Sequence, residues 1–562
     1  MSATRTIVAV SRPSAPSRSK AVAAKAVLGR RPLLTVVVPV YNGGDEIVDN
    51  VHVIQRAVSA GLPAEEVEVI VVSDGSIDDT AERLLAARSE AGIRVIHYDR
   101  NLGKGYAVKI GALAAHGAWV ALVDADLDLD PASVPLFLDT ARRENLDFAI
   151  GSKRHPDSVV HYPRSRRMSS WAYQQLNRLL FHLDVRDTQV GLKLFSRRVA
   201  EDVLPLLIVK RYAFDLELLA VATSRGYDRI RELPIRLQYR FAGSGVGSLA
   251  VAGALWDTAA IFYRLRILRT YERKRRLFGI AAPERFPLVS LVGEPEVAAT
   301  LDYPRLEQGE PAGSEEAELL AILARGARPG GNWVTAAVPF FTDPDVAAVV
   351  VPTVAPIRGT LGTRVAAAVL ESRLGGGSRR SLYLPGNVRE VSDHPAESVV
   401  VRRTDYRAAS NAGVERERLV AWLAARGRHT IYTPDASISA VPPPMIGPHL
   451  DGTLRHARAR GAVARQTRGA SLSGASARAL SPLAAALIGA VLLLFGGSLH
   501  TIGLILVLTY AGALVLSGLH TALRFRSALV GVLQPVAVIA SQAAYLCGFL
   551  QGLFARPSRT PH

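Results

Sequence analysis

The amino-acid sequence predicts an α/β fold with a mostly parallel sheet, followed by apolar helices near the C-terminus. Short β-branched runs alternate with amphipathic stretches from residue 33 onward, an order typical of parallel strands joined by helices. The chain has 562 residues, more than one ordinary domain needs. Long uncharged runs occupy much of residues 482–554, which indicates segments that can lie in a membrane.

The first part of the chain contains four short apolar runs that are expected to be strands. They cover residues 35–39, 67–72, 93–97 and 119–123. Strands that are buried on both faces of a parallel sheet read in this way. Ligands of such sheets bind at the carboxyl ends of the strands, so the polar residues that follow each run are candidate site residues.

Two acids, Asp124 and Asp126, end the fourth run. Carboxylates at positions i and i+2 after a strand can share one hard divalent cation, Mg²⁺ or Mn²⁺. A nucleoside diphosphate needs such a cation when it leaves. The pair therefore favours nucleotide-sugar chemistry.

The other strand ends carry further candidates for nucleotide binding. The first strand ends at Pro39, and Tyr41 and Glu46 follow it. Asp74, which can accept hydrogen bonds from a base or ribose, ends the second strand. Lys104 lies in a basic, glycine-bearing loop after the third strand and can place its charge beside a diphosphate. We assign these five residues, together with Asp124, to the nucleotide.

Taken in this order, the motifs of residues 33–241 resemble those of the family 2, GT-A-fold glycosyltransferases, and within them the synthases of polyprenyl (dolichyl) phosphate sugars. The resemblance implies a nucleoside contact for Asp74 and metal ligation by Asp124 and Asp126. It also implies a further ligand at Asp128.

Downstream strings look like the acceptor side of this family. Residues 187–195 are closer to the dolichyl-phosphate glucosyltransferase type than to the mannosyl type, although Ser73 and Lys153 depart from the usual residues, an acid and an arginine. The residues that the resemblance assigns to catalysis are Asp126, Lys153, Arg154, Arg167, Asp187 and Gln189.

A lipid monophosphate is already an anionic nucleophile near neutral pH, so its attack on the sugar needs little help from a general base. Cations that hold the phosphate matter more, and Lys153, Arg154 and Arg167 are expected to supply them. Direct displacement would invert the anomeric centre.

Simpler roles stay open for several of these side chains. The arginines at positions 164, 166 and 167 also fit a solvated or lipid-facing charge run. Asp187 and Gln189 also fit turn and cap positions. For Asp215 and Glu217 we expect a helix cap rather than a place in the acceptor cleft.

The chain changes character after the first domain. Residues 248–283 have aromatic and basic side chains at helical spacing, which fits an interfacial helix and a packing helix equally well. Residues 284–440 predict a second α/β domain, with a helix at 319–327 and a strand at 347–351. It weakly resembles the later half of a worn GT-A domain and has no credible metal pair, since Asp343 and Asp345 fit a turn.

Three apolar segments are predicted to cross a membrane, at about residues 482–498, 501–519 and 528–554. Basic residues flank them except in the first hairpin loop, so the positive-inside rule places the catalytic part in the cytoplasm, at the plasma membrane if the source is prokaryotic. A buried helical hairpin in a soluble protein is the alternative. The net charge of +17 would also suit nucleic acid, but the apolar tail argues for membrane lipid and no nucleic acid.

The two ends of the chain add little chemistry. The only cysteine is Cys547, so neither a disulfide framework nor a thiolate metal site is available. Residues 1–31 are basic and without acids, which fits a disordered arm or an organellar targeting segment. The predicted domains are 1–31 (arm), 32–247 (catalytic), 248–283 (interfacial helices), 284–440 (non-catalytic α/β), 441–481 (basic linker) and 482–554 (membrane helices).

The sequence thus predicts a membrane-bound, metal-dependent inverting glycosyltransferase. It would move a hexose from a nucleoside-diphosphate sugar to a polyprenyl or dolichyl phosphate, with UDP-glucose slightly favoured over GDP-mannose. Two alternatives are a family 2 transferase that acts on a polysaccharide or another membrane lipid, and a membrane scaffold without turnover.

Overall fold

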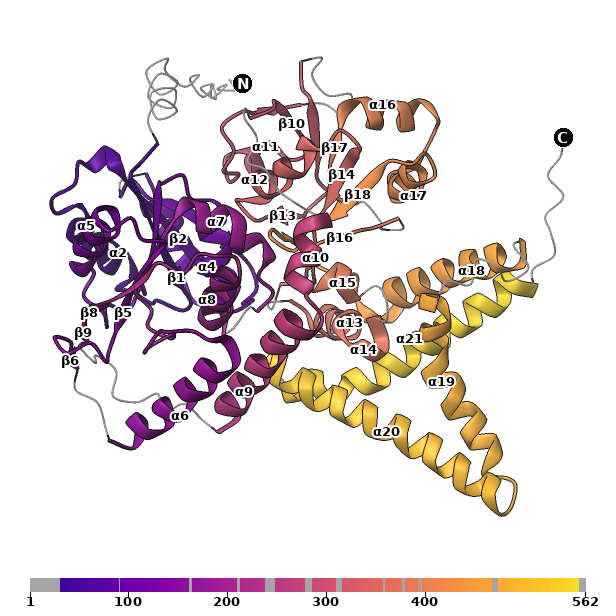
Figure 1. Ribbon diagram of the computed structural model, residues 1–562. Coiled ribbons are helices and arrows are strands. Elements are labelled where there is room, and N and C mark those ends of the chain that lie inside the picture. Colours follow the sequence, from indigo (N-terminus) through magenta and orange to yellow (C-terminus); the bar gives the residue numbers. More distant parts are fainter. Residues whose placement is uncertain are drawn as a thin grey trace, which may run out of the picture.

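Two α/β domains lie side by side, and long helices from the C-terminal part project away from them (Figure 1). This arrangement is taken from a computed structural model. It describes residues 31–89, 91–160, 164–209, 213–237, 248–277, 286–309, 316–356, 359–376, 380–392, 394, 397–466 and 474–554. The predicted basic arm lies outside the described residues, apart from Arg31.

The first domain contains a seven-stranded sheet in the order β3-β2-β1-β4-β7-β5-β8. Neighbouring strands are parallel except at β7, which is antiparallel to both β4 and β5. The predicted mostly parallel sheet is therefore confirmed, and each of the four predicted strands is present. The strands are β1 (Leu34–Val40), β2 (Val67–Asp74), β3 (Arg94–Tyr98), β4 (Trp119–Leu122), β5 (Phe148–Ser152), β7 (Lys193–Ser196) and β8 (Ile230–Pro234).

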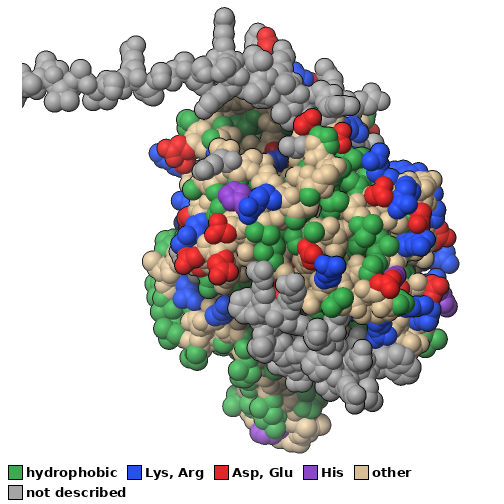
Figure 2. Space-filling view, turned by 90° about the vertical axis from the view of Figure 1, so that its left-hand side faces the viewer, with side chains coloured by type: hydrophobic (Ala, Val, Ile, Leu, Met, Phe, Trp, Pro, Cys, Tyr) green, Lys and Arg blue, Asp and Glu red, His purple; other side chains and the backbone are tan. Residues whose placement is uncertain are grey.

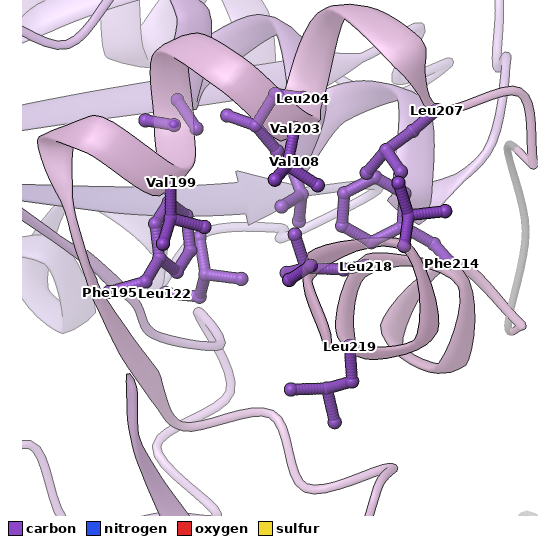
Figure 3. Close-up of a cluster of buried hydrophobic side chains, with 14 of the residues drawn as sticks. Val108, Leu122, Phe195, Val199, Val203, Leu204, Leu207, Phe214, Leu218 and Leu219 are labelled. Atoms are coloured by element: carbon purple, nitrogen blue, oxygen red, sulfur yellow. The ribbon is translucent and has the colours of Figure 1, made fainter. Parts of the chain in front are cut away.

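Helices cover both faces of this sheet. Figure 3 shows part of the core on one face, where Val108, Leu122, Phe195 and Leu218 pack together. Burial of such apolar side chains is the main favourable term in folding. The helices of the domain are α2 (Ile47–Ser59), α3 (Thr80–Ala87), α4 (Lys104–Leu113), α5 (Ser133–Arg143), α6 (Arg164–Phe181), α7 (Arg197–Val203) and α8 (Phe214–Ser224), and the short strands β6 (Val159–Val160) and β9 (Arg236–Leu237) pair beside them.

Within the described residues, the second domain repeats six strands of this topology, lacks a counterpart of β3 and adds the antiparallel edge strand β16. Its sheet has the order β11-β10-β12-β17-β14-β18-β16, and β17 is antiparallel to both of its neighbours, as β7 is. The likeness thus extends beyond the later half of the fold that the sequence indicated. The strands are β10 (Val289–Val292), β11 (Leu306–Gln308), β12 (Leu319–Ile322), β14 (Val346–Val350), β16 (Arg389–Glu390), β17 (Val399–Arg402) and β18 (His429–Tyr432).

One secondary-structure prediction in this domain is wrong. Residues 319–327 were expected to form a helix, but Leu319–Ile322 is the central strand β12 and a turn follows it. All four residues of β12 are buried. An apolar run that is covered on both sides has no periodicity that separates a strand from a helix. The predicted strand at 347–351 is confirmed as β14.

Short helices and a three-stranded sheet complete the second domain. Ion pairs connect the second domain to the first domain. Lys109 of α4 pairs with Asp435 at 2.6 Å, with both side chains less than a tenth exposed. Arg94 pairs with Asp302. The remaining elements are α11 (Pro295–Ala298), α12 (Trp333–Ala337), α13 (Leu361–Glu371), α14 (Arg373–Gly376), α15 (Arg380–Tyr383), α16 (Arg403–Asn411), α17 (Leu419–Ala424), β13 (Arg328–Pro329), β15 (Thr353–Val354) and β19 (Ile438–Ser439).

The segment between the domains is helical, with α9 (Ser248–Phe262), a π-helical turn (Tyr263–Ile267) and α10 (Thr270–Leu277). Ile261 and Tyr271 are buried in the core of the first domain, whereas Trp256 is 77% exposed. One face of this segment therefore packs against the first domain, as expected for a packing helix. Because Trp256 is exposed, contact of the other face with the membrane interface stays a prediction.

Two of the three predicted membrane segments have the length and composition of a span: α20 (Ser498–Phe525) and α21 (Ala528–Phe554). The first predicted segment lies in α19 (Gly474–Leu492), where only Pro482–Leu492 forms an apolar helical stretch, which is too short. Much of the predicted linker is the helix α18 (Leu450–Gln466), which packs along α21. The lower projection in Figure 2 is covered mostly by uncharged side chains, in keeping with the many exposed leucines of α20.

Candidate active site

A cavity of about 1420 Å³ lies at the carboxyl edge of the first sheet. It brings together residues from the ends of all four predicted strands, as the parallel topology requires. Every residue assigned to the nucleotide from the sequence lines it. These are Pro39, Tyr41, Glu46, Asp74, Lys104 and Asp124, and Asp126 lies beside them.

Asp74 organises the loop between β3 and α4. Its carboxylate accepts hydrogen bonds from the amides of Leu102 (2.7 Å) and Gly103 (3.0 Å) and from the hydroxyl of Tyr98 (2.9 Å). Burial, which those bonds only partly offset, raises the pKa of Asp74 to about 6. The next residue, Gly75, has φ +62°, and a Cβ there would lie 2.0 Å from the carbonyl carbon of Arg100. Only glycine permits this close approach.

Lys104 begins α4 and reaches the acid pair. Its Nζ lies 2.5 Å from Oδ1 of Asp124. Desolvation opposes the charge on Lys104, but the carboxylates of Asp124 and Asp215 outweigh it and raise the pKa of the lysine. Burial, together with the neighbouring charges of Asp124 and Asp128, raises the pKa of Asp126. At this edge of the sheet, Lys104 balances only part of the negative charge of the neighbouring aspartates.

Asp128 does not complete a three-acid metal site. Within the part of the chain that the structure describes, no group of three or more His, Cys, Asp or Glu side chains is placed to hold a metal ion. The main chain turns instead, and the amide of Asp128 donates to Asp126 (3.1 Å). Asp124 and Asp126 alone still fit Mg²⁺ or Mn²⁺, because these ions are often held by two carboxylates with phosphate and water oxygens. A cation there would offset both the burial of Asp126 and the repulsion from Asp124, which together raise the pKa of Asp126.

The predicted catalytic residues of the acceptor side gather in a second group, outside the cavity lining. The amide of Lys153 donates to Asp187 (3.3 Å), and so does the amide of Gln189 (3.3 Å). Arg154 is hydrogen-bonded to Gln174 of α6. Arg167 belongs to α6, but its side chain lies outside the described residues. The turn role of Asp187 is thus present in the structure.

Gly191 connects this group to the acid pair. A Cβ on Gly191 would lie 2.1 Å from Oδ2 of Asp124, so the loop that carries Asp187 backs directly onto the metal-site candidate. A side chain at this position would displace the carboxylate.

The caps predicted for Asp215 and Glu217 are wrong. Helix α8 has Ala213 at its N-cap and no side-chain cap bond. Asp215 pairs at 2.8 Å with Lys193, whose side chain is fully buried. Glu217 is fully buried and accepts hydrogen bonds from the amides of Ile208 and Val209. Buried charges require such partners, and no local sequence pattern identified them.

Seven cavity residues from outside the first domain were not predicted as part of the site. They come from the second domain and from the end of α20, hundreds of positions away in the sequence. In the sequence analysis, Arg524 and Arg526 contributed only to the positive-inside argument for membrane orientation. No sequence pattern indicates that they lie close to Asp124. The seven residues are Gly359, Arg364, His520, Leu523, Arg524, Phe525 and Arg526.

Part of the first domain is similar to known proteins. Residues 35–204 match the family described as "Glycosyl transferase family 2". The chain is 36% identical over 205 residues to "Glycosyltransferase AglD" of Haloferax volcanii, covering 36% of this chain and 32% of that protein. It is 36% identical over 202 residues to the "Dolichyl-phosphate beta-glucosyltransferase" of Drosophila melanogaster, covering 34% and 62%.

The human protein of the latter name is 32% identical over 212 residues, covering 34% of this chain and 62% of the relative. The match therefore spans between 32% and 62% of these relatives. Among solved structures, the chain matches glucosyl-3-phosphoglycerate synthase from Mycobacterium tuberculosis in complex with UDP. That match has 20% identity and a TM-score of 0.33, and it covers 50% of this chain and 90% of the other.

Proposed function

We propose that this chain, whose residues 35–204 form a family 2 glycosyltransferase domain, transfers a hexose from a nucleoside-diphosphate sugar to a polyprenyl or dolichyl phosphate. The carrying observation is the single cavity in which Asp74, Lys104, Asp124 and Asp126 meet. The glucosyl name of several relatives supports UDP-glucose over GDP-mannose as donor.

Each of these four residues has a task in this reaction. Asp74 accepts hydrogen bonds from the nucleoside, and Lys104 neutralises the diphosphate. Asp124 and Asp126 would hold Mg²⁺ or Mn²⁺, which supplies charge stabilisation for a departing diphosphate. The chain's own residues hold the donor so that its anomeric carbon faces the acceptor phosphate.

The acceptor is expected to enter from the membrane side. The end of the apolar helix α20 lines the same cavity, which supports a substrate whose chain lies in lipid. Lys153, Arg154 and Arg167 remain our candidates for steering its phosphate, with Asp187 and Gln189 shaping their loop. A cytoplasmic location of the catalytic part remains part of the proposal.

Transfer of radiolabelled sugar tests this function. Purified protein is given UDP-glucose or GDP-mannose, a divalent cation and polyprenyl phosphate in detergent, and the organic phase is counted. We expect label in that phase with wild type and none with Asp126→Ala. Label only in a water-soluble polymer would favour the polysaccharide alternative, and no product with any donor would favour the scaffold. Wild-type transfer by a folded Asp126→Ala variant would refute the metal assignment.

A further inference from the structure

One wall of the cavity does not belong to the transferase domain. Arg364 of α13 in the second domain lines it, and so do Arg524 and Arg526 at the end of α20. All acidic residues of the lining belong to the first domain, which also supplies Arg100 and Lys104. The charged residues that come from the second domain and from the apolar hairpin, α20 and α21, are all arginines.

A buried ion-pair network fixes the basic wall in place. Both oxygens of Glu371 are engaged by Arg100 of the first domain, and Arg524 Nε lies 2.9 Å from Oε2. Arg100 and Glu371 are each less than 5% exposed. Arg100 also lies over the ring of Phe525, 4.8 Å from its centroid. The Nε of Arg524 therefore serves this junction.

Arg364 has spare hydrogen-bonding capacity. Its NH2 group donates to the carbonyl of Phe525 (3.0 Å), one of the carbonyls that the end of α20 leaves unpaired. Its Nε is buried and has no hydrogen-bond partner. A buried donor without a partner costs free energy. Arg364 also lines the cavity, so a rotation of its guanidinium toward an anion there would relieve that cost.

Arg526 reaches across the mouth of the cavity. It ends α20 in the left-handed conformation, with φ +47°. Its guanidinium carbon lies 6.0 Å from the ring centroid of Tyr41 in the first domain, at the outer limit of a cation–π contact. The side chain is exposed, so little would oppose its turning toward a bound anion.

We propose that Arg364 and Arg526 form a phosphate-binding site that the second domain and the apolar hairpin contribute to the transferase cavity. Guanidinium groups bind phosphate in a bidentate manner, and phosphate is common to the donor diphosphate and the lipid acceptor. The inference rests on the proposed function, because it uses the same cavity, but it concerns binding and is tested without turnover.

The test measures binding of two phosphate ligands to the full-length protein. UDP with Mn²⁺ is titrated by calorimetry, and polyprenyl monophosphate is presented in neutral-lipid vesicles in a flotation assay. Arg526→Gln and Arg364→Gln are each expected to weaken at least one ligand by about tenfold, as the loss of a charge-assisted hydrogen bond does. Arg526→Lys should recover part of the loss. Arg418→Gln, on an exposed arginine of the second domain, is the matched control for loss of charge.

The two arms separate the sources of phosphate. A loss for UDP alone assigns the site to the donor, and a loss for the vesicles alone assigns it to the lipid. Unchanged binding of both ligands by both variants, with wild-type melting temperatures, would overturn the proposal. Wild-type protein that binds these ligands but transfers no sugar would refute the proposed function and leave this site standing.

Discussion

The two α/β domains share the topology of six strands, but they differ in the side chains at the strand ends. In the first domain, the amide of Val123, just after β4, donates a hydrogen bond to the carbonyl of Val37 in β1 (3.1 Å). In the second domain, the amide of Leu323, just after β12, donates in the same way to the carbonyl of Val292 in β10 (2.9 Å). This matching register aligns Asp124 with Ala324. Two positions later, Asp126 aligns with Gly326. The second domain therefore lacks the acid pair at the equivalent strand end.

The antiparallel strand beside it differs in the same way. Lys193 of β7 and Val399 of β17 hold equivalent register positions. Two residues earlier stand Gly191 and the exposed Glu397, so a bulky side chain is present where no aspartate carboxylate needs the space. The sheet is kept by its buried strands, while activity depends on a few side chains at one edge. We therefore propose that the second domain supports the first rather than carrying out chemistry of its own.

The largest effect is expected from a substitution in the acid pair, Asp124 and Asp126. Asp124→Asn should lower kcat/KM for sugar transfer by about 1000-fold, because the departing diphosphate loses its charge stabilisation. Asp343→Ala in the second domain should leave turnover within about twofold, since Asp343 forms a local turn with the amide of Asp345. Lost turnover in a folded Asp343→Ala variant would contradict a supporting role.

A second effect tests how the domains are joined. Glu371→Gln leaves the buried Arg100 without its charge partner, which costs about 3–5 kcal/mol. The melting temperature in detergent should fall by roughly 5 °C or more. Glu390→Gln, which affects only an exposed pair with His429, should shift it by less than about 2 °C. Equal shifts would show that the buried network does not hold the junction.

A third effect compares equivalent positions in the two sheets. Gly191→Ala should displace Asp124, because the new Cβ would lie 2.1 Å from its Oδ2. Misplacement by about 1 Å can cost up to about 100-fold in rate. We expect kcat/KM to fall roughly 10–100-fold in a steady-state assay. Glu397→Ala, at the matching exposed position, should leave kcat/KM unchanged, and a full-rate Gly191→Ala variant would rule out this close packing.

The smallest effect is a dependence on pH. The pKa of Asp74 is about 6 because of burial, so its carboxylate should protonate below that pH and lose acceptor capacity for the nucleoside. The affinity for UDP should then fall by up to about tenfold per pH unit below pH 6. Titration calorimetry between pH 5 and 8 measures this, and a flat profile would contradict it.

The same group affects stability with the opposite sign. An unfolded aspartate ionises near pH 4. Between about pH 4 and pH 6 the folded protein therefore holds a proton that the unfolded chain has released, so its stability falls as the pH rises through this window.

The sequence predicted the part of the site that follows strand ends. Apolar runs locate buried strands, and parallel topology brings their ends together, so Asp74 and Asp124 could be placed before any coordinates. The second-domain strand β12 was missed because a run buried on both faces has no diagnostic period. Arg364 and Arg526 were missed because their approach to Asp124 depends on how separate domains dock.

The position of Arg526 also has a consequence for synthesis of the chain. The cavity lining begins at Pro39 and includes Arg526, which leaves the ribosome almost five hundred positions later. The first domain can fold early, but this lining remains incomplete until the apolar hairpin has docked against it. Capacity to bind substrate would therefore arise only after the last helices have found their place.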